Sequence, residues 1–500
     1  MQYLLGLDNG GTSSKAVLFD QTGREIASAK RNTPMETPKV GFTERDMELL
    51  WQVNCEVIRE TIEKSGVSAG DIAGVSFSGH GKGLYLWGAD EKPAWRGIVS
   101  TDSRAYRIVE AWYQDGTAEA AFTKTCQSVL ASQPVALLRW FLDNQPEVLD
   151  RTKWIFGVKD YVRYRMTGEA NAEITDISGS SLVNLTTASY DDEILKLFGL
   201  ESIREKLPPL CYSSQFCGKV TKECAHLSGL HAGTPVAAGL FDIDACAIGM
   251  NVTNDDYLAA IAGTWSINEY VSPRPIMDRS VKMNSLYCLK DMYLVEECSP
   301  TSASNQEWFV NSFLKEAAGD RKLYKVADEM VEAVRPDEAN IVFLPYLFGG
   351  TDDPRAGASF VNINASHTRA HMLRAVYEGI IFGHKLHIDR LVGSRVHPPK
   401  GVRLAGGVTN APMWVQMFAD ILEMDVETIE VKELGALGAA MTAAVAAGLY
   451  PDLAAAAAQM VKVSRVYHPD PALSKVYRRK FQDFRTVADA MSPVWAKLER

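Results

Sequence analysis

The segment LLGLDNGGTSSKAVLFD at 4–20 constrains the fold of this 500-residue chain more than any other. Two apolar stretches flank a short turn of glycines and hydroxyls, which predicts a β-hairpin and not a strand followed by a helix. Glycines let backbone N–H groups approach phosphate oxygens, hydroxyls donate further hydrogen bonds, and a nearby aspartate can hold magnesium through water. An ordinary Asn-Gly hairpin turn would explain the glycines but not the hydroxyls and lysine in one row. The side chains concerned are Asp8, Thr12, Ser13, Ser14 and Lys15.

Two later segments extend this pattern. GLFDIDA places Asp242 directly after an apolar stretch, and YLAAIAGTWS repeats the hairpin form with Gly263 and Thr264 in its turn. Together the three segments are typical of a kinase cleft, in which turns hold phosphates and an aspartate accepts the proton of the attacking hydroxyl. From the residues alone Asp244 competes with Asp242 for that role, and a loop with two solvated acids is the alternative.

The chain length predicts two large domains, because a single hydrophobic core rarely grows beyond roughly 250–300 residues. The active site is then expected in a cleft between them. The hairpins that begin near residues 4 and 257 have the same form, which indicates internal duplication with one hairpin opening each half. Prolines and polar residues before the second hairpin favour a boundary near 248–256. We therefore expect domains at 1–248 and 249–500.

Period-2 apolar stretches alternate with amphipathic segments, which predicts an α/β fold with mixed sheets flanked by helices. The clearest helices are expected over 46–64 and 369–392. His384 and His387 stand three residues apart on the second helix, so a metal site is one interpretation and core histidines are the other. The small residues of 433–448 predict a closely packed core helix.

The composition is that of a globular chain, with 46% hydrophobic and 23% charged residues, so no disordered domain is expected. A formal net charge of −10 argues against a nucleic-acid partner, which needs a clustered basic face. The eight cysteines include no Cys-x-x-Cys pair and are expected to be thiols in a reducing compartment. The first strand begins almost at once, and no apolar run reaches the roughly 18 residues of a membrane span. We therefore expect no signal peptide, no membrane partner and a cytoplasmic location.

A glycine-rich turn follows another apolar strand in VSFSGHGKGLYLW. Its glycines invite a dinucleotide-binding interpretation, but the residues after the turn predict a strand, whereas that fingerprint needs a helix to meet the pyrophosphate. His80, Gly81 and Lys82, which stand at this strand end, are candidate substrate contacts. Asp102 and Arg104, in VSTDSRA, are a further candidate pair, for which a surface ion pair is the alternative.

These segments resemble the FGGY carbohydrate kinases, which share the sugar kinase, heat-shock and actin-like ATPase fold, over nearly the whole chain. The segment from Asp8 to Lys15 is similar to the family's first phosphate motif, with Gly11 where a threonine is usual. Residues 134–140 resemble part of a family signature, with Leu137 in place of a lysine. GVRLAGGVTNAPMWVQMFADIL resembles the adenosine segment, with Gly406, Gly407, Gln416 and Asp420 at the matching spacing and Asn410 slightly closer to the glycines than in some relatives. The resemblance implies two actin-like, ribonuclease H-like ATPase domains that use ATP and Mg²⁺.

The resemblance also implies a role for each matching residue. Asp242 matches the catalytic base, which selects it over Asp244, and Asp8 matches the residue on the magnesium side, where it acts through water. Ser100 stands where the tryptophan of a Trp-x-Asp-x-Arg element is usual. The implied ATP-phosphate contacts are Thr12, Ser13, Lys15, Gly263 and Thr264, and the implied adenosine contacts are Gly407 and Asn410. The implied sugar contacts are His80, Gly81, Lys82, Asp102 and Arg104.

The expected partner is a small-molecule sugar. Xylulose kinases commonly carry Met-His where Gly81 and Lys82 stand, a change that opens space and adds a cation. This variant resembles the L-xylulose kinases, which also accept keto-sugar acids such as 3-keto-L-gulonate. We therefore expect ATP-dependent phosphorylation of a ketopentose such as L-xylulose or D-xylulose, or of a keto-sugar acid. The alternatives are a kinase of glycerol, erythritol or ribitol, and an actin-like nucleotide switch or regulatory sugar-binding protein. The oligomeric state is open, with a homodimer as one option.

Overall fold

The structure is a computed structural model that describes residues 2–319, 321–350, 353 and 355–498. Its contacts divide the chain into two compact units. Unit 1 runs to Thr253 and adds Val271–Val295 and Glu433–Lys462, and unit 2 comprises Asn254–Tyr270, Glu296–Lys432 and the residues from Val463 on. The units are interleaved along the chain. The sequence domains 1–248 and 249–500 stay a prediction.

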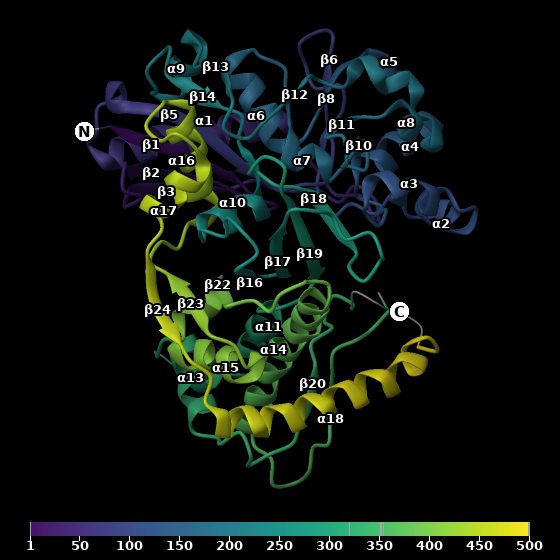
Figure 1. The fold of residues 1–500 in the computed structure, drawn as a ribbon, viewed down its shortest axis with the longest axis vertical. Helices are drawn as coiled ribbons and strands as arrows, with labels where there is room; N and C mark the ends of the chain where they lie inside the picture. The colour runs from purple at the N-terminus through teal and green to yellow at the C-terminus, as the bar shows by residue number, and fades with distance from the viewer. Residues whose placement is uncertain (1, 320, 351–352, 354, 499–500) are drawn as a thin grey trace. The chain divides into compact units, whose positions relative to one another are not determined.

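Unit 1 contains one large sheet, several two-stranded pieces and the helices that cover them (Figure 1). Its strands are β1 (Tyr3–Asn9), β2 (Ser13–Asp20), β3 (Glu25–Asn32), β4 (Glu44–Arg45), β5 (Ile72–Gly79), β6 (Tyr85–Gly88), β7 (Gly97–Ile98), β8 (Thr152–Phe156), β9 (Ala172–Glu173), β10 (Val183–Asn184), β11 (Ser189–Tyr190), β12 (Leu210–Cys211), β13 (Phe216–Lys219), β14 (Pro235–Ala237), β15 (Leu240–Phe241) and β18 (Met283–Leu286). Its α-helices are α1 (Met47–Ser65), α2 (Tyr106–Gln114), α3 (Thr117–Thr125), α4 (Pro134–Asn144), α5 (Pro146–Arg151), α6 (Val158–Thr167), α7 (Ile174–Ser178), α8 (Asp192–Phe198), α9 (Lys222–Ser228), α10 (Asp242–Gly249), α16 (Leu434–Ala446) and α17 (Leu453–Met460).

Unit 2 is built from a second sheet and a group of longer helices. Its strands are β16 (Tyr257–Ala262), β20 (Val342–Leu344), β21 (Ser359–Val361), β22 (Gly401–Ala405), β23 (Val426–Ile429) and β24 (Val463–Tyr467). Its helices are α11 (Ser304–Phe313), α12 (Lys315–Ala318), α13 (Leu323–Glu332), α14 (Arg369–Gly393), the 3-10 turn η3 (Gly407–Asn410), α15 (Pro412–Leu422) and α18 (Pro471–Trp495). Two strands, β17 (Ser266–Ser272) and β19 (Tyr293–Ser299), run across a unit boundary.

The large sheet of unit 1 is mixed, with the strand order β13-β14-β5-β1-β2-β3 and β15 paired to β5. β1 and β2 form the antiparallel hairpin predicted from the first segment, with Asp8 opposite Lys15. β5 is parallel to β1, and β15 is parallel to β5, so these three strands end at one edge of the sheet. This edge brings together residues that follow three separate segments of the chain.

Successive residues of β1 face opposite sides of the sheet, so its core residues lie on one face and Asp8 lies on the other. Leu5 and Leu7 belong to the hydrophobic core that this sheet shares with α1. Gly6 faces α16 instead, where an added Cβ would lie 2.0 Å from the carbonyl oxygen of Ala436. Close packing of α16 on the sheet therefore requires glycine here, and Asp8 follows on the same face.

The strands of unit 2 repeat the arrangement of unit 1. Their order is β17-β16-β22-β23-β24, with β16 antiparallel to β17, β22 parallel to both β16 and β23, and β24 antiparallel to β23. In unit 1 the order β2-β1-β5-β14-β13 has the same succession of antiparallel and parallel pairs. The topology therefore agrees with the internal duplication predicted from the two hairpins.

Two long helices confirm predictions from periodicity. The helix predicted over 46–64 is α1, which begins after Asp46, whose side chain accepts a hydrogen bond from the backbone of Leu49, and ends at Gly66 with a φ of 65°. The helix predicted over 369–392 is α14. Within the described ranges, no helix is long and apolar enough to cross a membrane.

Candidate active site

The sheet edge where β1 and β5 end carries the first group of polar residues in unit 1. The Oγ of Ser78 donates a hydrogen bond to Oδ1 of Asp8 over 2.6 Å, and the backbone N–H of His80 donates to the carbonyl oxygen of Asn9 over 2.9 Å. Burial raises the pKa of the Asp8 carboxyl, although the hydrogen bond from Ser78 acts in the opposite direction. A cation beside Asp8 would be favourable here, because it stabilises the ionised carboxylate.

Asp242 is the first residue of α10 and follows β15 directly. Burial raises the pKa of its carboxyl well above the ordinary value, repulsion from Asp8 and Asp176 raises it further, and the charge of Lys82 lowers it. Asp8, Lys82 and Asp242, which come from three separate segments, are therefore within electrostatic reach of one another. The loop alternative is wrong, because Asp242 and Asp244 both lie in the first turn of a helix and Asp244 is wholly buried.

The turn between β1 and β2 places its hydroxyls on opposite sides. Ser14 is buried, and its Oγ donates to Oδ1 of Asn9 over 2.8 Å, where Nδ2 of Asn54 from α1 also donates over 2.8 Å. Thr12 is exposed and Ser13 is half-buried. Strand alternation explains the difference between the two serines. Ser14 therefore fixes the turn to α1, while Thr12 and Ser13 stay predicted phosphate contacts.

Two basic residues also hold this turn. Lys15 forms an ion pair with Glu433, the residue before α16. The Nη2 of Arg45 donates to the carbonyl oxygen of Gly11, and its Nη1 donates to Oγ1 of Thr33 over 3.4 Å. Arg45 is buried and was not predicted from the sequence. Contact of Lys15 with a phosphate stays a prediction.

The turn after β5 puts Lys82 in the left-handed backbone region, with a φ of 63°, followed by Gly83 with a φ of 73°. An added Cβ on Gly81 would lie 2.4 Å from Cε2 of Phe241. The expectation that Gly81 opens space is therefore wrong, because the ring of Phe241 fills that space. The added cation does act on this site, since the charge of Lys82 lowers the pKa of Asp242.

His80 is buried at the same strand end and is a neutral group. Its Nε2 lies 3.2 Å from the hydroxyl oxygen of Tyr85, and its Nδ1 lies 3.3 Å from the carbonyl oxygen of Gly81. Burial, together with the charge of the nearby Arg45, lowers its pKa to about 3. A neutral imidazole makes one hydrogen bond at each nitrogen and adds no charge, so His80 would bind a ligand by exchanging one of these two protein partners for it.

Asp102 and Arg104 form a buried ion pair. The Nη2 of Arg104 lies 2.8 Å from Oδ2 of Asp102 and 2.7 Å from Oε1 of Glu44, and the backbone N–H of Thr43 donates to Asp102 over 2.7 Å. The side chains of Asp102 and Arg104 are both 0% exposed. The surface ion-pair alternative is therefore wrong, and the pair ties the segment around β4 to the turn after β7. Contact of either residue with a sugar stays a prediction.

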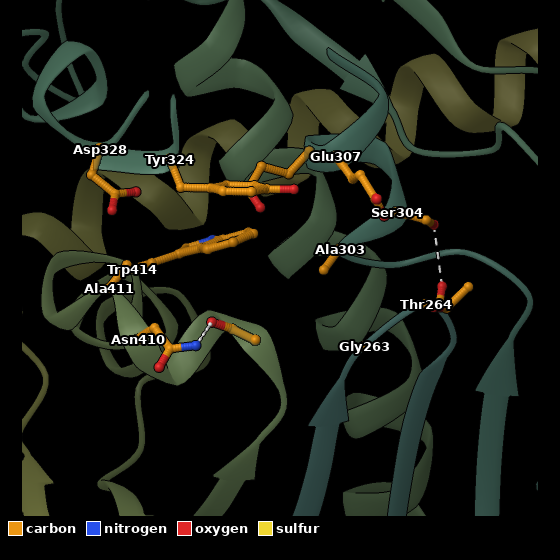
Figure 2. Close-up of a pocket in the computed structure, with 12 residues that line it drawn as sticks. Gly263, Thr264, Ala303, Ser304, Glu307, Tyr324, Asp328, Asn410, Ala411 and Trp414 are labelled. Carbon is orange, nitrogen blue, oxygen red and sulfur yellow. Dashed lines mark hydrogen bonds between the residues drawn. The ribbon is translucent and has the colours of Figure 1, made fainter. Parts of the chain in front are cut away.

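In unit 2 the start of α11 holds the turn between β16 and β17. The backbone N–H of Ala303 donates to the carbonyl oxygen of Gly263 over 2.8 Å, and that of Ser302 donates to the carbonyl oxygen of Thr264 over 3.0 Å. The Oγ of Ser304 also donates to the carbonyl oxygen of Thr264, over 3.2 Å (Figure 2). The side chain of Thr264 is exposed. An exposed hydroxyl beside a glycine fits the predicted phosphate contact.

β22 ends beside this turn, because it pairs with β16 in parallel. Gly406 follows with a φ of 98°, and an added Cβ would lie 2.3 Å from the carbonyl oxygen of Ala262, so only glycine fits. The Nδ2 of Asn410 donates to the carbonyl oxygen of Gly407 over 3.1 Å, and its Oδ1 accepts from Nζ of Lys432 over 2.6 Å. Asn410 is therefore held in place by two contacts while its side chain stays exposed.

A pocket of about 480 Å³ opens between these two turns within unit 2 (Figure 2). All four predicted nucleotide contacts of this unit line it, namely Gly263, Thr264, Gly407 and Asn410. Its volume suits a ligand of nucleotide size. Helices α11, α13 and α15 supply lining residues that were not predicted, among them Gln306, Glu307, Tyr324, Asp328 and Trp414.

Sequence models of one family match both halves of the chain. The N-terminal domain of the FGGY family of carbohydrate kinases matches residues 3–249, and its C-terminal domain matches residues 258–447. The chain belongs to the FGGY family of carbohydrate kinases. The resemblance drawn from the sequence motifs is confirmed, and so is the prediction that the chain is a carbohydrate kinase.

This FGGY kinase is similar to named relatives over its full length. The "Probable L-xylulose kinase" of Pasteurella multocida (strain Pm70) is 36% identical over 492 residues, which are 98% of this chain and 99% of the relative. The "L-xylulose/3-keto-L-gulonate kinase" of Escherichia coli (strain K12) is 34% identical over 500 residues, with 100% and 99% covered. The crystal structure of ligand-bound xylulose kinase from Lactobacillus acidophilus has a TM-score of 0.91, 26% identity and 100% coverage of both chains. The α/β fold with actin-like domains is therefore as predicted.

The histidine pair on α14 of this kinase belongs to the core of unit 2. The Nδ1 of His384 lies 2.7 Å from Oδ1 of Asn268, and its Nε2 lies 2.9 Å from Oγ of Ser302. Burial lowers the pKa of His384 to about 3. His387 lies 3.2 Å from Oε2 of Glu297. These contacts favour the core interpretation, and no group of three metal-ligating side chains is found among the residues that the structure describes.

Sequence reasoning missed a buried charge cluster that acts on Asp242. The Nζ of Lys159 lies 3.0 Å from Oδ1 of Asp160, 3.2 Å from Oε2 of Glu173 and 3.5 Å from Oδ2 of Asp176. All four side chains are buried, and Asp176 raises the pKa of Asp242. Lys159 and Asp160 are neighbours at the start of α6, and two adjacent charges there are equally typical of a solvated helix face.

Gln416 and Asp420 have a structural role away from the pocket lining described above. The Nε2 of Gln416 donates to Oδ1 of Asp420 over 2.9 Å and to the carbonyl oxygen of His468 over 2.8 Å. The two residues therefore tie α15 to the segment before α18. Leu137, which stands where a lysine is usual in the family, is wholly buried in the core around α4.

Proposed function

We propose that this FGGY kinase transfers the γ-phosphate of ATP to a ketopentose of the L-xylulose type or to a keto-sugar acid. The observation that carries the proposal is the pairing of β15 with β5, which sets the turn that contains Lys82 against the strand end that leads into Asp242, within electrostatic reach of its carboxyl. An ammonium group next to the reacting aspartate can bind a carbonyl, a hydroxyl or a carboxylate of the ligand. The printed names of the two relatives, an L-xylulose kinase and an L-xylulose/3-keto-L-gulonate kinase, support the same substrate class.

In the proposed reaction the carboxylate of Asp242 accepts the proton of the attacking sugar hydroxyl. The hydroxyl oxygen bonds to the γ-phosphorus, the bond from that phosphorus to the β–γ bridging oxygen breaks, and ADP leaves. The raised pKa of Asp242 supports this role, because a general base works best when its pKa lies near the operating pH. His80 and Lys82 would orient the sugar toward Asp242.

Magnesium fits the acidic edge formed by Asp8 and Asp242. Asp8 raises the pKa of Asp242 by repulsion, and a divalent cation would relieve that repulsion. Because the described residues contain no group of three metal-ligating side chains, most ligands of the ion would be waters and phosphate oxygens, as magnesium prefers. The ion would neutralise charge on the transferring phosphoryl group.

Each unit has a turn that we propose to contact phosphate oxygens of ATP, and unit 2 would also hold the adenosine. The pocket of unit 2 supports this assignment, because it combines a Gly-Thr turn with a volume of about 480 Å³. The proposed phosphate contacts are Thr12, Ser13 and Lys15 in unit 1 and Gly263 and Thr264 in unit 2. The proposed adenosine contacts are Gly407 and Asn410.

A panel of sugars assayed for coupled ADP release tests the proposal. We expect turnover with L-xylulose, D-xylulose or 3-keto-L-gulonate, and far slower turnover with ribitol or glycerol. Robust activity on a polyol alone would instead support the polyol-kinase alternative. ATP hydrolysis that is independent of any added sugar would support a nucleotide switch. The homodimer stays a prediction, which sedimentation velocity checks.

The variant Lys82→Ala tests the residue that carries the substrate assignment. Loss of an ammonium that donates to a ligand oxygen should lower kcat/KM by roughly one to two orders of magnitude. The loss should be largest for the keto sugars and sugar acids. Equal small losses on every substrate would reject a role for Lys82 in specificity.

A further inference from the structure

The pocket of unit 2 has two chemically different ends. Thr264 and Ser304 lie at one end, and Asp328, Tyr324 and Trp414 gather at the other (Figure 2). The first end contains the turn proposed to contact phosphates. The second end combines aromatic rings with a carboxylate and an indole N–H, which is a combination that suits a flat ring system with polar edges.

Trp414 contributes a hydrogen-bond donor that the protein itself does not satisfy. Its side chain is only 2% exposed, and its Nε1 has no hydrogen-bond partner among the described residues. Buried N–H groups are nearly always paired in proteins, so this donor indicates a ligand atom that accepts a hydrogen bond. The donor comes from α15, directly after the proposed adenosine contacts of η3.

Asp328 is held near Trp414 by a shared neighbour, Tyr377. The ring centroids of Tyr377 and Trp414 are 4.2 Å apart with an interplanar angle of 31°. The hydroxyl of Tyr377 donates to Oδ1 of Asp328 over 2.8 Å, and Nε2 of Gln306 donates to that hydroxyl oxygen over 2.5 Å. This chain of hydrogen bonds orients the carboxylate of Asp328, whose other oxygen, Oδ2, can accept from a ligand.

We propose that Asp328 selects adenine over guanine in this kinase, with Trp414 as the partner donor. At position 6 adenine carries an amino group, which donates hydrogen bonds, whereas guanine carries a carbonyl oxygen, which accepts them. A carboxylate accepts from the amino group and repels the carbonyl oxygen. The N–H of Trp414 meets a ring nitrogen that accepts. The inference rests on the proposed function, since it requires the pocket of unit 2 to be the nucleotide site.

The variant Asp328→Asn tests the inference with the hydrogen bond from Tyr377 preserved, because an amide oxygen can accept it while the amide NH₂ donates to guanine. We expect wild type to use ATP at least about 100-fold better than GTP, measured as kcat/KM at saturating sugar. Asp328→Asn should lower this ratio about tenfold or more. The ratio is measured on one protein sample, so it does not depend on the folded fraction.

Glu332→Gln is the matched control, because it removes a carboxylate one helical turn further along α13 that also acts on the pKa of Asp328. Its ATP-to-GTP ratio should stay within about twofold of wild type. An unchanged ratio in Asp328→Asn, or the same shift in Glu332→Gln, would overturn the inference.

Calorimetric titration with ADP and GDP gives a second readout without sugar, in which Trp414→Phe should weaken ADP binding about tenfold. If no sugar were phosphorylated but ADP still bound much more tightly than GDP through Asp328, the proposed function alone would fail.

Discussion

Lys82 stands close enough to Asp242 for its positive charge to oppose the rise in pKa that burial causes in that carboxyl. The lysine lies in the turn after β5 and the aspartate begins α10, so the parallel pairing of β15 with β5 creates the pair. Asp8 and Asp176 act in the other direction. The proton affinity of Asp242 is therefore raised by burial and by two acids, and lowered by a hydrogen bond from the backbone of Ile243 and by the charge of Lys82.

Lys82→Met should move the acid limb of the pH profile to higher pH. Removing the cation raises the pKa of Asp242 further, so a smaller fraction of the carboxylate is ionised at a given pH and the base is lost earlier on acidification. The measurement is kcat/KM for L-xylulose from about pH 5 to pH 9 in both proteins. An acid limb that does not move would show that Lys82 has no influence on the catalytic proton acceptor.

Asp242→Asn should abolish most of the turnover while sugar binding survives, because the amide is nearly isosteric but cannot accept the proton. A general base typically contributes about 10²–10⁴-fold. Asp244→Asn is the matched control from the same helical turn, and its kcat per folded protein should stay near wild type. The opposite outcome, with Asp244→Asn inactive and Asp242→Asn active, would make Asp244 the base.

Asp242→Asn should also stabilise the folded protein at neutral pH. A carboxyl whose pKa is raised in the folded state binds its proton more tightly when folded, so stability falls as the pH rises above the unfolded value of about 3.9. Asp242→Asn removes that cost, which is about 1.4 kcal/mol for each pKa unit. Urea denaturation at pH 7.5 and at about pH 4 checks this, since the gain should shrink at the lower pH.

Gly81→Ala should impair the kinase through Phe241, the residue before Asp242. The new Cβ would lie 2.4 Å from Cε2 of the ring, so the ring or the turn must move. Overpacking of this kind costs about 1–3 kcal/mol, and a shift near the base should lower kcat about tenfold or more. Gly81→Ala combined with Phe241→Leu should recover part of both losses, whereas no recovery would mean that the strain lies elsewhere.

Local sequence patterns were enough to predict the elements that carry the site. Strand alternation, helical period and turn residues within a few positions predicted these elements. They are the hairpins β1–β2 and β16–β17, the helix α1 and the strand after the glycine-rich turn. The motif spacing then indicated the family. For these parts no long-range information was needed, because the determining residues are neighbours in the chain.

Contacts between distant segments were not predicted, because each partner is unremarkable by itself. Phe241 fills the space beside Gly81, and Asn54 of α1 meets Ser14 in the hairpin. Asp328 of α13 lines the pocket of unit 2, where Tyr377 of α14 donates a hydrogen bond to it. Which face of a strand or helix is buried can be inferred from period, but the partner on that face is decided by tertiary packing.

Asp102→Asn should destabilise unit 1 by about 1–3 kcal/mol, since it removes one of the two carboxylates that pair with the buried Arg104 and leaves Glu44 as the other. The exposed pair of Glu423 and Arg478 supplies the control, and Glu423→Gln should cost less than about 1 kcal/mol. Chemical denaturation measures both. A normal stability for Asp102→Asn together with a raised KM for the sugar would contradict a purely structural role. It would instead support the prediction that Asp102 contacts the sugar.

Asp8→Asn should raise the magnesium requirement of the reaction. The amide oxygen can still accept the hydrogen bond from Ser78, so the turn is preserved while the negative charge that attracts the ion is removed. The magnesium concentration for half-maximal rate should rise about tenfold, and binding of the sugar without nucleotide should not change.

Because Asp8 also raises the pKa of Asp242, the acid limb of the pH profile in Asp8→Asn should move to lower pH, the opposite direction from Lys82→Met. Ser78→Ala keeps the carboxylate and should keep the magnesium dependence. A folded Asp8→Asn protein with an unchanged magnesium requirement would reduce the first segment to an ordinary hairpin turn.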